Sequence, residues 1–191
     1  MAGTYSEAPN QMVSAAIGID YAYRQLGDGA VPLVLLQHFR GNLDNWDPAL
    51  VDALASNRRV VTFDNVGVGA STGTTPSTVA QMADDAIAFL ASMELDEVDI
   101  LGFSIGSFVA QEMTLKRPIC CSDSPRSTSL CFVANGDSDP MILPHYSYLL
   151  AGLMPQARLE IYPDSAHGFL FQHHAVFAAD VDEFLTEPIS S

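Results

Sequence analysis

Basic residues are scarce in this sequence. Lysine and arginine together number 8, against 23 aspartates and glutamates, and the formal net charge at pH 7 is -15. A surface this acidic repels phosphate backbones and anionic lipid headgroups at any separation within the Debye length. The charge therefore argues against nucleic acid and against anionic membrane surfaces as partners.

Long hydrophobic runs are also missing. No apolar stretch approaches the roughly 20 residues that a membrane-spanning helix requires. Residues 1–11 contain neither the basic region nor the apolar region of a secretory signal. From these absences we expect a cytoplasmic protein with no membrane association.

Cysteine is rare and its spacing is uninformative. The three cysteines, Cys120, Cys121 and Cys131, include no C-x-x-C pair. An odd number with two adjacent members predicts free thiols, and neither a disulfide framework nor a zinc site. His173 and His174 are neighbours and cannot face one ligand from the same helix. We therefore expect no metal and no cofactor.

The chain of 191 residues is 48% hydrophobic, which suffices for one domain covering residues 1–191. Short dense apolar runs alternate with longer stretches of helical periodicity. This alternation predicts the α/β class, with a mostly parallel sheet and helices on both faces. A hairpin around Gly18 is expected in residues 13–25, followed by strands at residues 31–37, 59–63, 98–103, 129–134 and 158–162.

Helix boundaries are marked by capping residues. Asp47-Pro48 supplies an N-cap and a first-turn proline for a helix that ends near Ala55. Thr78-x-x-Gln81 predicts a capping box at the start of the next helix. Further helices are expected after Ser104, ending before Pro118, and at residues 145–154. A last helix presents the apolar residues Phe177, Val181, Phe184 and Leu185.

One motif carries a specific chemical meaning. Residues 102–106, Gly-Phe-Ser-Ile-Gly, match G-x-S-x-G directly after a predicted buried strand and directly before a helix. A turn this tight forces Ser104 into an unfavourable backbone conformation, and the two glycines remove side chains that would collide. The Ser104 hydroxyl is thereby held at the carboxyl edge of the sheet, where it is a candidate nucleophile.

A serine hydroxyl attacks only when a base takes its proton and a carboxylate orients that base. Asp137 and Asp139 follow the strand at residues 129–134, and His167 follows the strand at residues 158–162. The carboxyl ends of parallel strands are where open α/β sheets place their ligands. Either aspartate can serve as the acid here, because a shift of two residues keeps a carboxylate in the same loop.

At this point the chain resembles the α/β-hydrolase family, in the branch of non-haem haloperoxidases, perhydrolases, carboxylesterases and lactonases. The resemblance covers residues from about 13 to 117 and from about 129 to 187. Besides the motif at residues 102–106, it rests on four segments: H-F-R-G at residues 38–41, D-N-V-G-V-G-A-S at residues 64–71, G-D-S-D-P-M at residues 136–141 and A-H-G-F at residues 166–169.

The resemblance implies a role for several residues. Ser104 corresponds to the nucleophile, His167 to the base, and Asp139, three residues after the strand-end glycine, to the acid. The oxyanion hole corresponds to the backbone N–H groups of Phe39 and Ile105. The other candidates follow from position: Arg40 and Phe103 stand beside these groups and are candidates for substrate binding, whereas Asp64 is expected to hold a structural turn.

The chain departs from the family at residues 119–128. Members of the family place another strand here, followed by a helical lid, and ten residues cannot supply both. We therefore expect a lidless, truncated fold with one strand fewer. A gap in the sheet would leave backbone groups unpaired on both sides. The sequence thus predicts that the strand at residues 129–134 pairs directly with the strand at residues 98–103.

The function expected from these features is a cofactor-free serine hydrolase acting on a carboxylic ester, thioester or lactone. Without a lid, the pocket around Ser104 should be open to bulky small-molecule substrates. The alternative is a catalytically impaired hydrolase fold, acting as a binding or interaction module or arising as a shortened splice product. Apolar surface left uncovered by the missing helices predicts self-association into a homo-oligomer.

Overall fold

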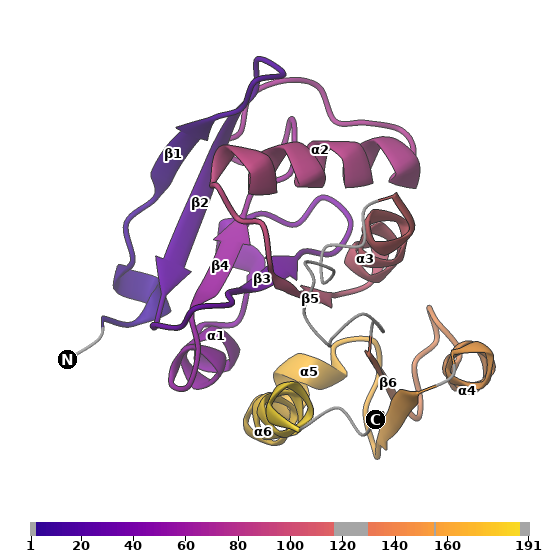
Figure 1. Cartoon of the computed structure of the whole chain (residues 1–191). Helices are drawn as coiled ribbons and strands as arrows, with labels where there is room; N and C mark the ends of the chain where they lie inside the picture. Colours follow the sequence, from indigo (N-terminus) through magenta and orange to yellow (C-terminus); the bar gives the residue numbers. More distant parts are fainter. Residues whose placement is uncertain (1–2, 117–129, 155, 188–191) are drawn as a thin grey trace. The chain divides into compact units, whose positions relative to one another are not determined.

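The computed structural model describes residues 3–116, 130–154 and 156–187, and the chain divides into two compact units (Figure 1). Unit 1 is Met1–Ser127 and unit 2 is Thr128–Ser191. The junction at residues 119–128, with Cys120 and Cys121, lies outside the described residues, as does the predicted helix end at residues 117–118. The prediction of a single domain stays a prediction.

A five-stranded sheet forms the centre of unit 1, in the order β1-β2-β4-β3-β5. The strands are β1 (Gln11–Ser14), β2 (Asp20–Leu26), β3 (Leu33–Leu36), β4 (Val60–Phe63) and β5 (Asp99–Gly102). β1 and β2 form the predicted antiparallel hairpin, with Gly18 at a φ of 82° in its turn. β2 is antiparallel to β4, whereas β3 is parallel to both β4 and β5.

Helices cover both faces of this sheet, as predicted (Figure 1). α1 (Pro48–Ala55) lies on one face, and α2 (Val79–Ser92) and α3 (Ile105–Lys116) lie on the other. Val34 and Leu36 belong to the core cluster that includes residues of α2 and α3. Leu33 and Leu35, which alternate with them along β3, are equally buried. β3 is therefore apolar on both faces because each face is covered by helices.

The predicted N-caps of α1 and α2 are present, and the capping box of α2 differs from the prediction. The Asp47 carboxylate accepts a hydrogen bond from the N–H of Ala49 at 2.9 Å, and the Thr78 hydroxyl accepts one from the N–H of Gln81 at 3.2 Å. The Gln81 side chain does not return to the backbone of Thr78 but donates to Asp85 at 2.9 Å. The capping box predicted for α2 is thus half-formed, because a carboxylate one turn further along offers Gln81 a charged acceptor.

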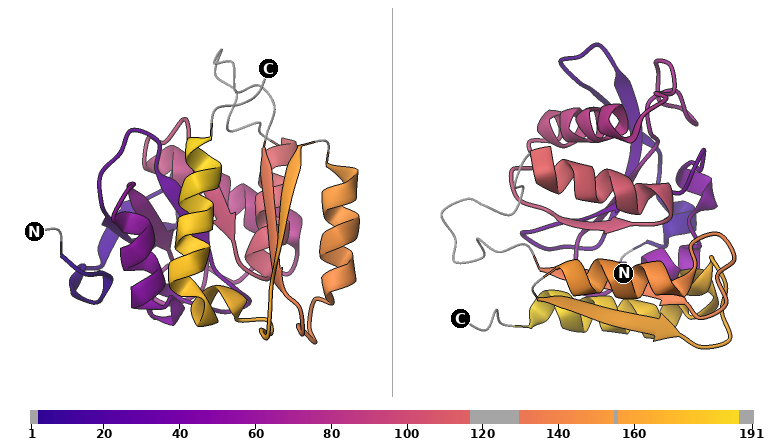
Figure 2. Two further views of the ribbon diagram at one scale, coloured as in Figure 1. Left: turned by 90° about the horizontal axis from the view of Figure 1, so that it is seen from below. Right: turned by 90° about the vertical axis from the view of Figure 1, so that its right-hand side faces the viewer.

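Unit 2 contains a second, two-stranded sheet. β6 (Cys131–Gly136) and β7 (Ala157–Tyr162) are parallel and paired over all six residues. α4 (Pro144–Leu153) and α6 (His174–Thr186) lie on opposite sides of the pair, and the short α5 (Phe169–Gln172) precedes α6 (Figure 2, left). Phe132 of β6 stacks on Phe177 and Phe184 of α6, as the predicted apolar face of this helix requires.

One predicted strand pairing joins the two units. The strand at residues 129–134 was expected to pair with the strand before Ser104. Within the units, β5 is hydrogen-bonded to β3 and one edge of β6 to β7, and the pairing of β6 with β5 stays a prediction. No helix within residues 3–116, 130–154 and 156–187 is long and apolar enough to cross a membrane.

Candidate active site

Ser104 lies in a sharp turn between β5 and α3. Its φ is 57°, in the left-handed region that side chains disfavour. A Cβ on Gly106 would lie 2.2 Å from the carbonyl oxygen of Leu36, and one on Gly102 would lie 2.4 Å from the carbonyl oxygen of Gly106. Both glycines are therefore required by close backbone packing, and the turn predicted around the candidate nucleophile is present.

The loop after β3 presents a second strained turn. Arg40 has a φ of 59°, and the N–H of Gly41 donates to the carbonyl of His38 at 3.0 Å. The His38 Nδ1 contacts the Phe39 carbonyl at 3.0 Å, and the His38 ring packs edge-on against Phe103 at 5.7 Å between centroids. His38 thus links this loop to the residue that precedes Ser104.

The two backbone N–H groups predicted for an oxyanion hole are available. Within the part of the chain that the structure describes, neither the N–H of Phe39 nor that of Ile105 donates to another residue. Ile105 is the first residue of α3, where helical N–H groups have no partner within the helix. Because helix N-termini attract negative charge, this position suits a developing oxyanion.

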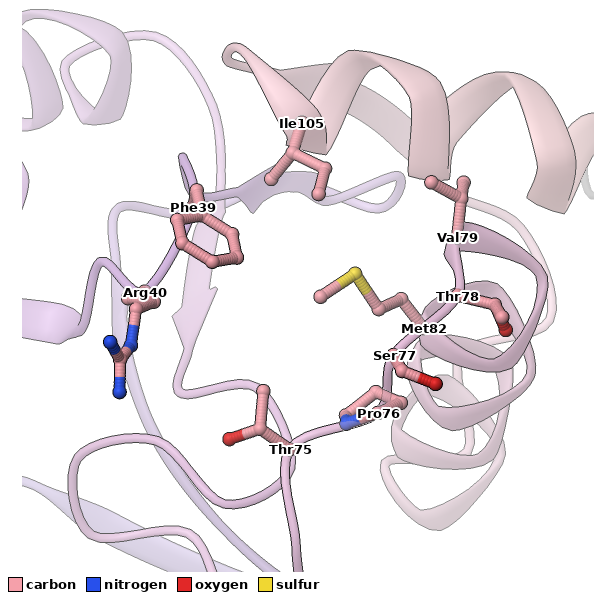
Figure 3. A pocket seen from close by; sticks show the side chains of 9 residues that line it. All are labelled: Phe39, Arg40, Thr75, Pro76, Ser77, Thr78, Val79, Met82 and Ile105. Carbon is pink, nitrogen blue, oxygen red and sulfur yellow. The ribbon is translucent and has the colours of Figure 1, made fainter.

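A pocket of about 430 Å³ lies next to these groups (Figure 3). Its wall contains Phe39, Arg40 and Ile105, together with part of the loop before α2 and its first turn. The loop and helix residues are Thr75, Pro76, Ser77, Thr78, Val79 and Met82. Phe103 is not among them, because its ring is buried, with 7% exposure, against His38. The residues from the loop before α2 had no signal in the sequence that pointed to a site.

In unit 2, Asp139 and His167 are hydrogen-bonded to each other. The His167 Nδ1 lies 2.8 Å from Oδ2 of Asp139, whose side chain is buried. The other carboxylate oxygen accepts the N–H groups of Met141 at 2.7 Å and Ile142 at 3.1 Å. Burial works against the ionised form, but the hydrogen bonds from His167, Ile142 and Met141 together outweigh it and lower the pKa of Asp139.

Asp137, the alternative acid, has different partners. Its carboxylate accepts the N–H groups of Asp164 at 3.0 Å and Ser165 at 3.2 Å, and the hydroxyl of Ser138 at 2.9 Å. These bonds, that from Asp164 above all, lower the pKa of Asp137. Because Asp164 and Ser165 begin the loop that carries His167, Asp137 ties the ends of β6 and β7 together.

Gly136 allows the same loop to approach closely. A Cβ at this position would lie 2.3 Å from the carbonyl oxygen of Ser165 and 2.5 Å from that of Ala166. The backbone just before His167 therefore passes directly over the end of β6. Asp139 lies three residues after Gly136 in the chain, and this close approach places the His167 ring within its reach.

Asp64 has the structural role predicted for it. Its buried carboxylate accepts the N–H groups of Leu43 at 2.7 Å and Ala70 at 2.8 Å. Burial is the largest influence and raises the pKa of Asp64 despite these bonds. The residue joins two loops at the carboxyl ends of β3 and β4.

The structure thus brings the predicted site residues together in two groups. Phe39, Arg40 and Ile105 share one pocket in unit 1, and Ile105 directly follows Ser104 in the chain. Asp139 and His167 form a hydrogen-bonded pair in unit 2. That the pair serves Ser104 stays a prediction. Among the described residues, no group of three or more histidine, cysteine, aspartate or glutamate side chains is arranged to hold a metal ion.

Comparison with known proteins identifies the family. Residues 31–124 match the family model described as the alpha/beta hydrolase fold. The solved structure of an alpha/beta hydrolase fold protein from Chitinophaga pinensis is 27% identical to the chain, with a TM-score of 0.90 over 97% of this chain and 100% of that chain. The chain belongs to the α/β-hydrolase family. The mixed sheet and the turn around Ser104 are therefore those of an α/β-hydrolase.

Curated relatives of this α/β-hydrolase fit the branch that its motifs resemble. The chain is similar to the protein named "Putative carbamate hydrolase RutD" from Rhizobium rhizogenes, with 33% identity over 91 residues. It is also similar to "Putative non-heme bromoperoxidase BpoC" from Mycobacterium tuberculosis, with 34% identity over 101 residues. The matches cover 47% and 52% of this chain but only 34% and 38% of the relatives. The matched part thus spans little more than a third of their length.

Proposed function

We propose that this α/β-hydrolase is a serine hydrolase that cleaves a carboxylic ester, thioester or lactone through an acyl-enzyme. Ser104 Oγ attacks the carbonyl carbon and passes its proton to the Nε2 of His167. The negative oxygen of the tetrahedral intermediate accepts hydrogen bonds from the N–H groups of Phe39 and Ile105. Collapse of the intermediate expels the alcohol, thiol or ring oxygen, which takes the proton from His167.

The second half of the cycle uses the same groups. A water molecule gives its proton to His167 and attacks the acyl carbon. The bond to Ser104 Oγ then breaks, the serine regains a proton, and the carboxylic acid leaves. Asp139 remains ionised throughout and holds the ring with Nδ1 protonated, so that Nε2 carries no proton and can accept the one from serine. No cofactor takes part in these steps.

The observation that carries this proposal is the conformation of Ser104. A non-glycine residue at a φ of 57°, between two glycines that permit no Cβ, is a costly arrangement. Strain of this kind persists where function requires it. Two further observations support the same reading: a pair of backbone N–H groups without acceptors near this turn, and a histidine already oriented by a buried carboxylate.

The proposal requires the two units to join with His167 of unit 2 beside Ser104 of unit 1. The alternative function, a binding or interaction module derived from a hydrolase, is favoured by the short junction at residues 119–128 and by the partial match to the relatives. The two functions differ in one respect that can be measured. Only an enzyme has a Ser104 that reacts faster than other serines.

The test is hydrolysis of p-nitrophenyl acetate by the full chain. Wild type is expected to release p-nitrophenol and Ser104→Ala to lose this activity. The matched control is Ser56→Ala, because Ser56 is exposed and, within the described part of the chain, its hydroxyl bonds to the carbonyl of Ala53 in its own helix turn. Activity retained by Ser104→Ala would place the nucleophile elsewhere. Inactivity of a folded wild-type chain would favour the binding module.

We also propose that the chain self-associates in the cytoplasm. In unit 2 the apolar side chains of Tyr146, Leu149 and Leu153 on α4 are 56%, 60% and 81% exposed. Their spacing of three and four residues places them on one face of the helix. Sedimentation velocity is expected to show a dimer or larger species, and a monomer at all concentrations would contradict this proposal.

A further inference from the structure

The pocket beside Phe39 and Ile105 is an apolar hollow with one charged residue in its wall. Figure 3 shows the Phe39, Ile105 and Met82 side chains directed into it and the Arg40 guanidinium at its edge. Among the described residues, no aspartate, glutamate or lysine belongs to the wall, although the chain contains 23 acidic residues. One side of the pocket consequently combines apolar surface with a single positive charge.

The other polar side chains of the wall are largely committed to the protein itself. The Thr75 hydroxyl donates to the carbonyl of Gly67 at 3.1 Å, and the Thr78 hydroxyl accepts the N–H of Gln81 at 3.2 Å. These bonds hold the loop and the start of α2, so the two threonines have little capacity for a ligand. Arg40 and the hydroxyl of Ser77 remain as the groups able to recognise a polar part of a substrate.

Arg40 is exceptional among the basic residues that the structure describes. Arg24, Lys116 and Arg158 form ion pairs at 2.7, 2.6 and 2.9 Å, and Arg59 donates to Gln25 at 3.0 Å. Arg58 also has a partner. Within the described residues, the structure gives the Arg40 side chain neither a hydrogen bond nor an ion pair. In a chain of net charge -15, a guanidinium without a carboxylate partner is unexpected.

The backbone adds an independent indication. The described non-glycine residues with positive φ are Arg40, Glu94, Ser104 and Asp164. Ser104 is the proposed nucleophile, and Asp164 stands in the loop of the proposed base. Glu94 directly follows the C-cap of α2, where a left-handed residue commonly closes a helix. Arg40 is the strained residue that lines the pocket. A left-handed backbone at an arginine is strained, because its Cβ crowds the following carbonyl oxygen. Such strain is characteristic of positions that hold a ligand.

We infer that this pocket binds the acyl arm of a substrate that carries a carboxylate, with Arg40 as the partner of that carboxylate. The inference rests on the proposed function, since the pocket adjoins the N–H groups that would hold the oxyanion. The arm is apolar along its length, where it contacts Val79, Met82 and Ile105, and ends in the anion. Guanidinium and carboxylate groups match in geometry and charge, which gives selectivity over neutral acyl arms.

The first test measures binding without catalysis. Chain labelled with 13C-methyl methionine is titrated with hexanoate and with hexanamide, which have the same length and differ in charge. The Met82 methyl resonance, assigned by its loss in Met82→Leu, reports occupancy of the pocket. We expect hexanoate to bind more tightly than hexanamide by about two- to fivefold, the range for an exposed ion pair.

Two variants separate Arg40 from general charge. Arg40→Gln is expected to remove the preference for hexanoate. Arg59→Gln removes the same charge at the amino end of β4, away from the pocket, and is expected to retain the preference. Equal binding of the two ligands by wild type, or an equal effect of both variants, would overturn the inference.

The second test compares turnover of two substrates. One is the p-nitrophenyl monoester of adipic acid, which carries a carboxylate, and the other is its methyl ester, which is uncharged. The ratio of kcat/KM for the charged substrate to kcat/KM for the uncharged one is expected to fall in Arg40→Gln. The ratio should fall by the same factor as the binding preference, and the change should appear in KM. Charge-selective binding without any hydrolysis would sustain the pocket inference and refute the serine hydrolase. Hydrolysis without charge selectivity would support the serine hydrolase and refute the pocket inference.

Discussion

The substitution Asp139→Asn separates the catalytic role of this carboxylate from its structural role. Oδ1 of Asp139 accepts two backbone N–H groups, from Met141 and Ile142, and Oδ2 contacts the His167 ring at 2.8 Å. An asparagine keeps the carbonyl oxygen for the two N–H groups. Its amide NH2 then faces Nδ1 of His167. Because NH2 is a donor, Nδ1 can form this hydrogen bond only as the acceptor, without its proton.

The effect on activity follows from the imidazole tautomer. With Nδ1 unprotonated, the ring proton moves to Nε2, which can no longer take a proton from Ser104. The loss expected for a triad whose histidine is held in the wrong tautomer is about 10,000-fold in kcat. The effect on folding is small, since one charge-assisted hydrogen bond is exchanged for a neutral one, at about 1 kcal/mol.

Asp139→Ala provides the contrast. It leaves the N–H groups of Met141 and Ile142 without their acceptor, and each unsatisfied buried donor costs about 1–3 kcal/mol. Activity with p-nitrophenyl acetate and urea unfolding are measured for both variants. We expect both variants to be similarly inactive and Asp139→Ala to be clearly the less stable of the two. Asp139→Asn with more than a tenth of wild-type activity would show that Asp139 does not orient a catalytic histidine.

Further predictions concern the turns around the site. Gly106→Ala should destabilise unit 1 by about 1–3 kcal/mol in urea unfolding, because its Cβ would meet the backbone of Leu36 at 2.2 Å. Gly152→Ala in α4, where a Cβ meets nothing within 4 Å, should instead stabilise the chain by about 0.5–1 kcal/mol; the opposite order would refute this account of glycine. Asp137→Ala should release the loop that carries His167 and lower kcat, with partial rescue by Asp137→Asn; wild-type kcat in the alanine variant would contradict this role. Since the pKa of Asp139 is lowered on folding, its contribution to stability is present above the unfolded pKa and lost as pH falls through the folded pKa; the difference in the free energy of unfolding between wild type and Asp139→Asn should therefore be largest above the unfolded pKa and shrink as pH falls through the folded pKa, and a difference that stays constant with pH would contradict the shift.

Local signals explain why much of the fold was predictable. Each strand at residues 31–37 and 59–63 is a dense apolar run because both of its faces are buried, and Asp47 and Thr78 cap their helices through neighbours within three residues. The motif at residues 102–106 is equally local, since its glycines meet backbone only a few residues away or on the next strand.

Features that depend on distant residues were not predictable. The pocket gathers Phe39, Met82 and Ile105 from three separate segments, and no spacing in the sequence links them. The choice between Asp137 and Asp139 depends on where the loop after β7 passes, which the two residues cannot reveal by position.

The most direct test of the central claim is the rate at which a fluorophosphonate labels the full chain. We expect rapid labelling at Ser104, located by peptide mapping, and no labelling of Ser104→Ala. Labelling of His167→Ala should be slowed at least 100-fold, as loss of a general base requires. A wild-type chain that is folded but unlabelled, or a His167→Ala variant labelled as fast as wild type, would contradict this claim.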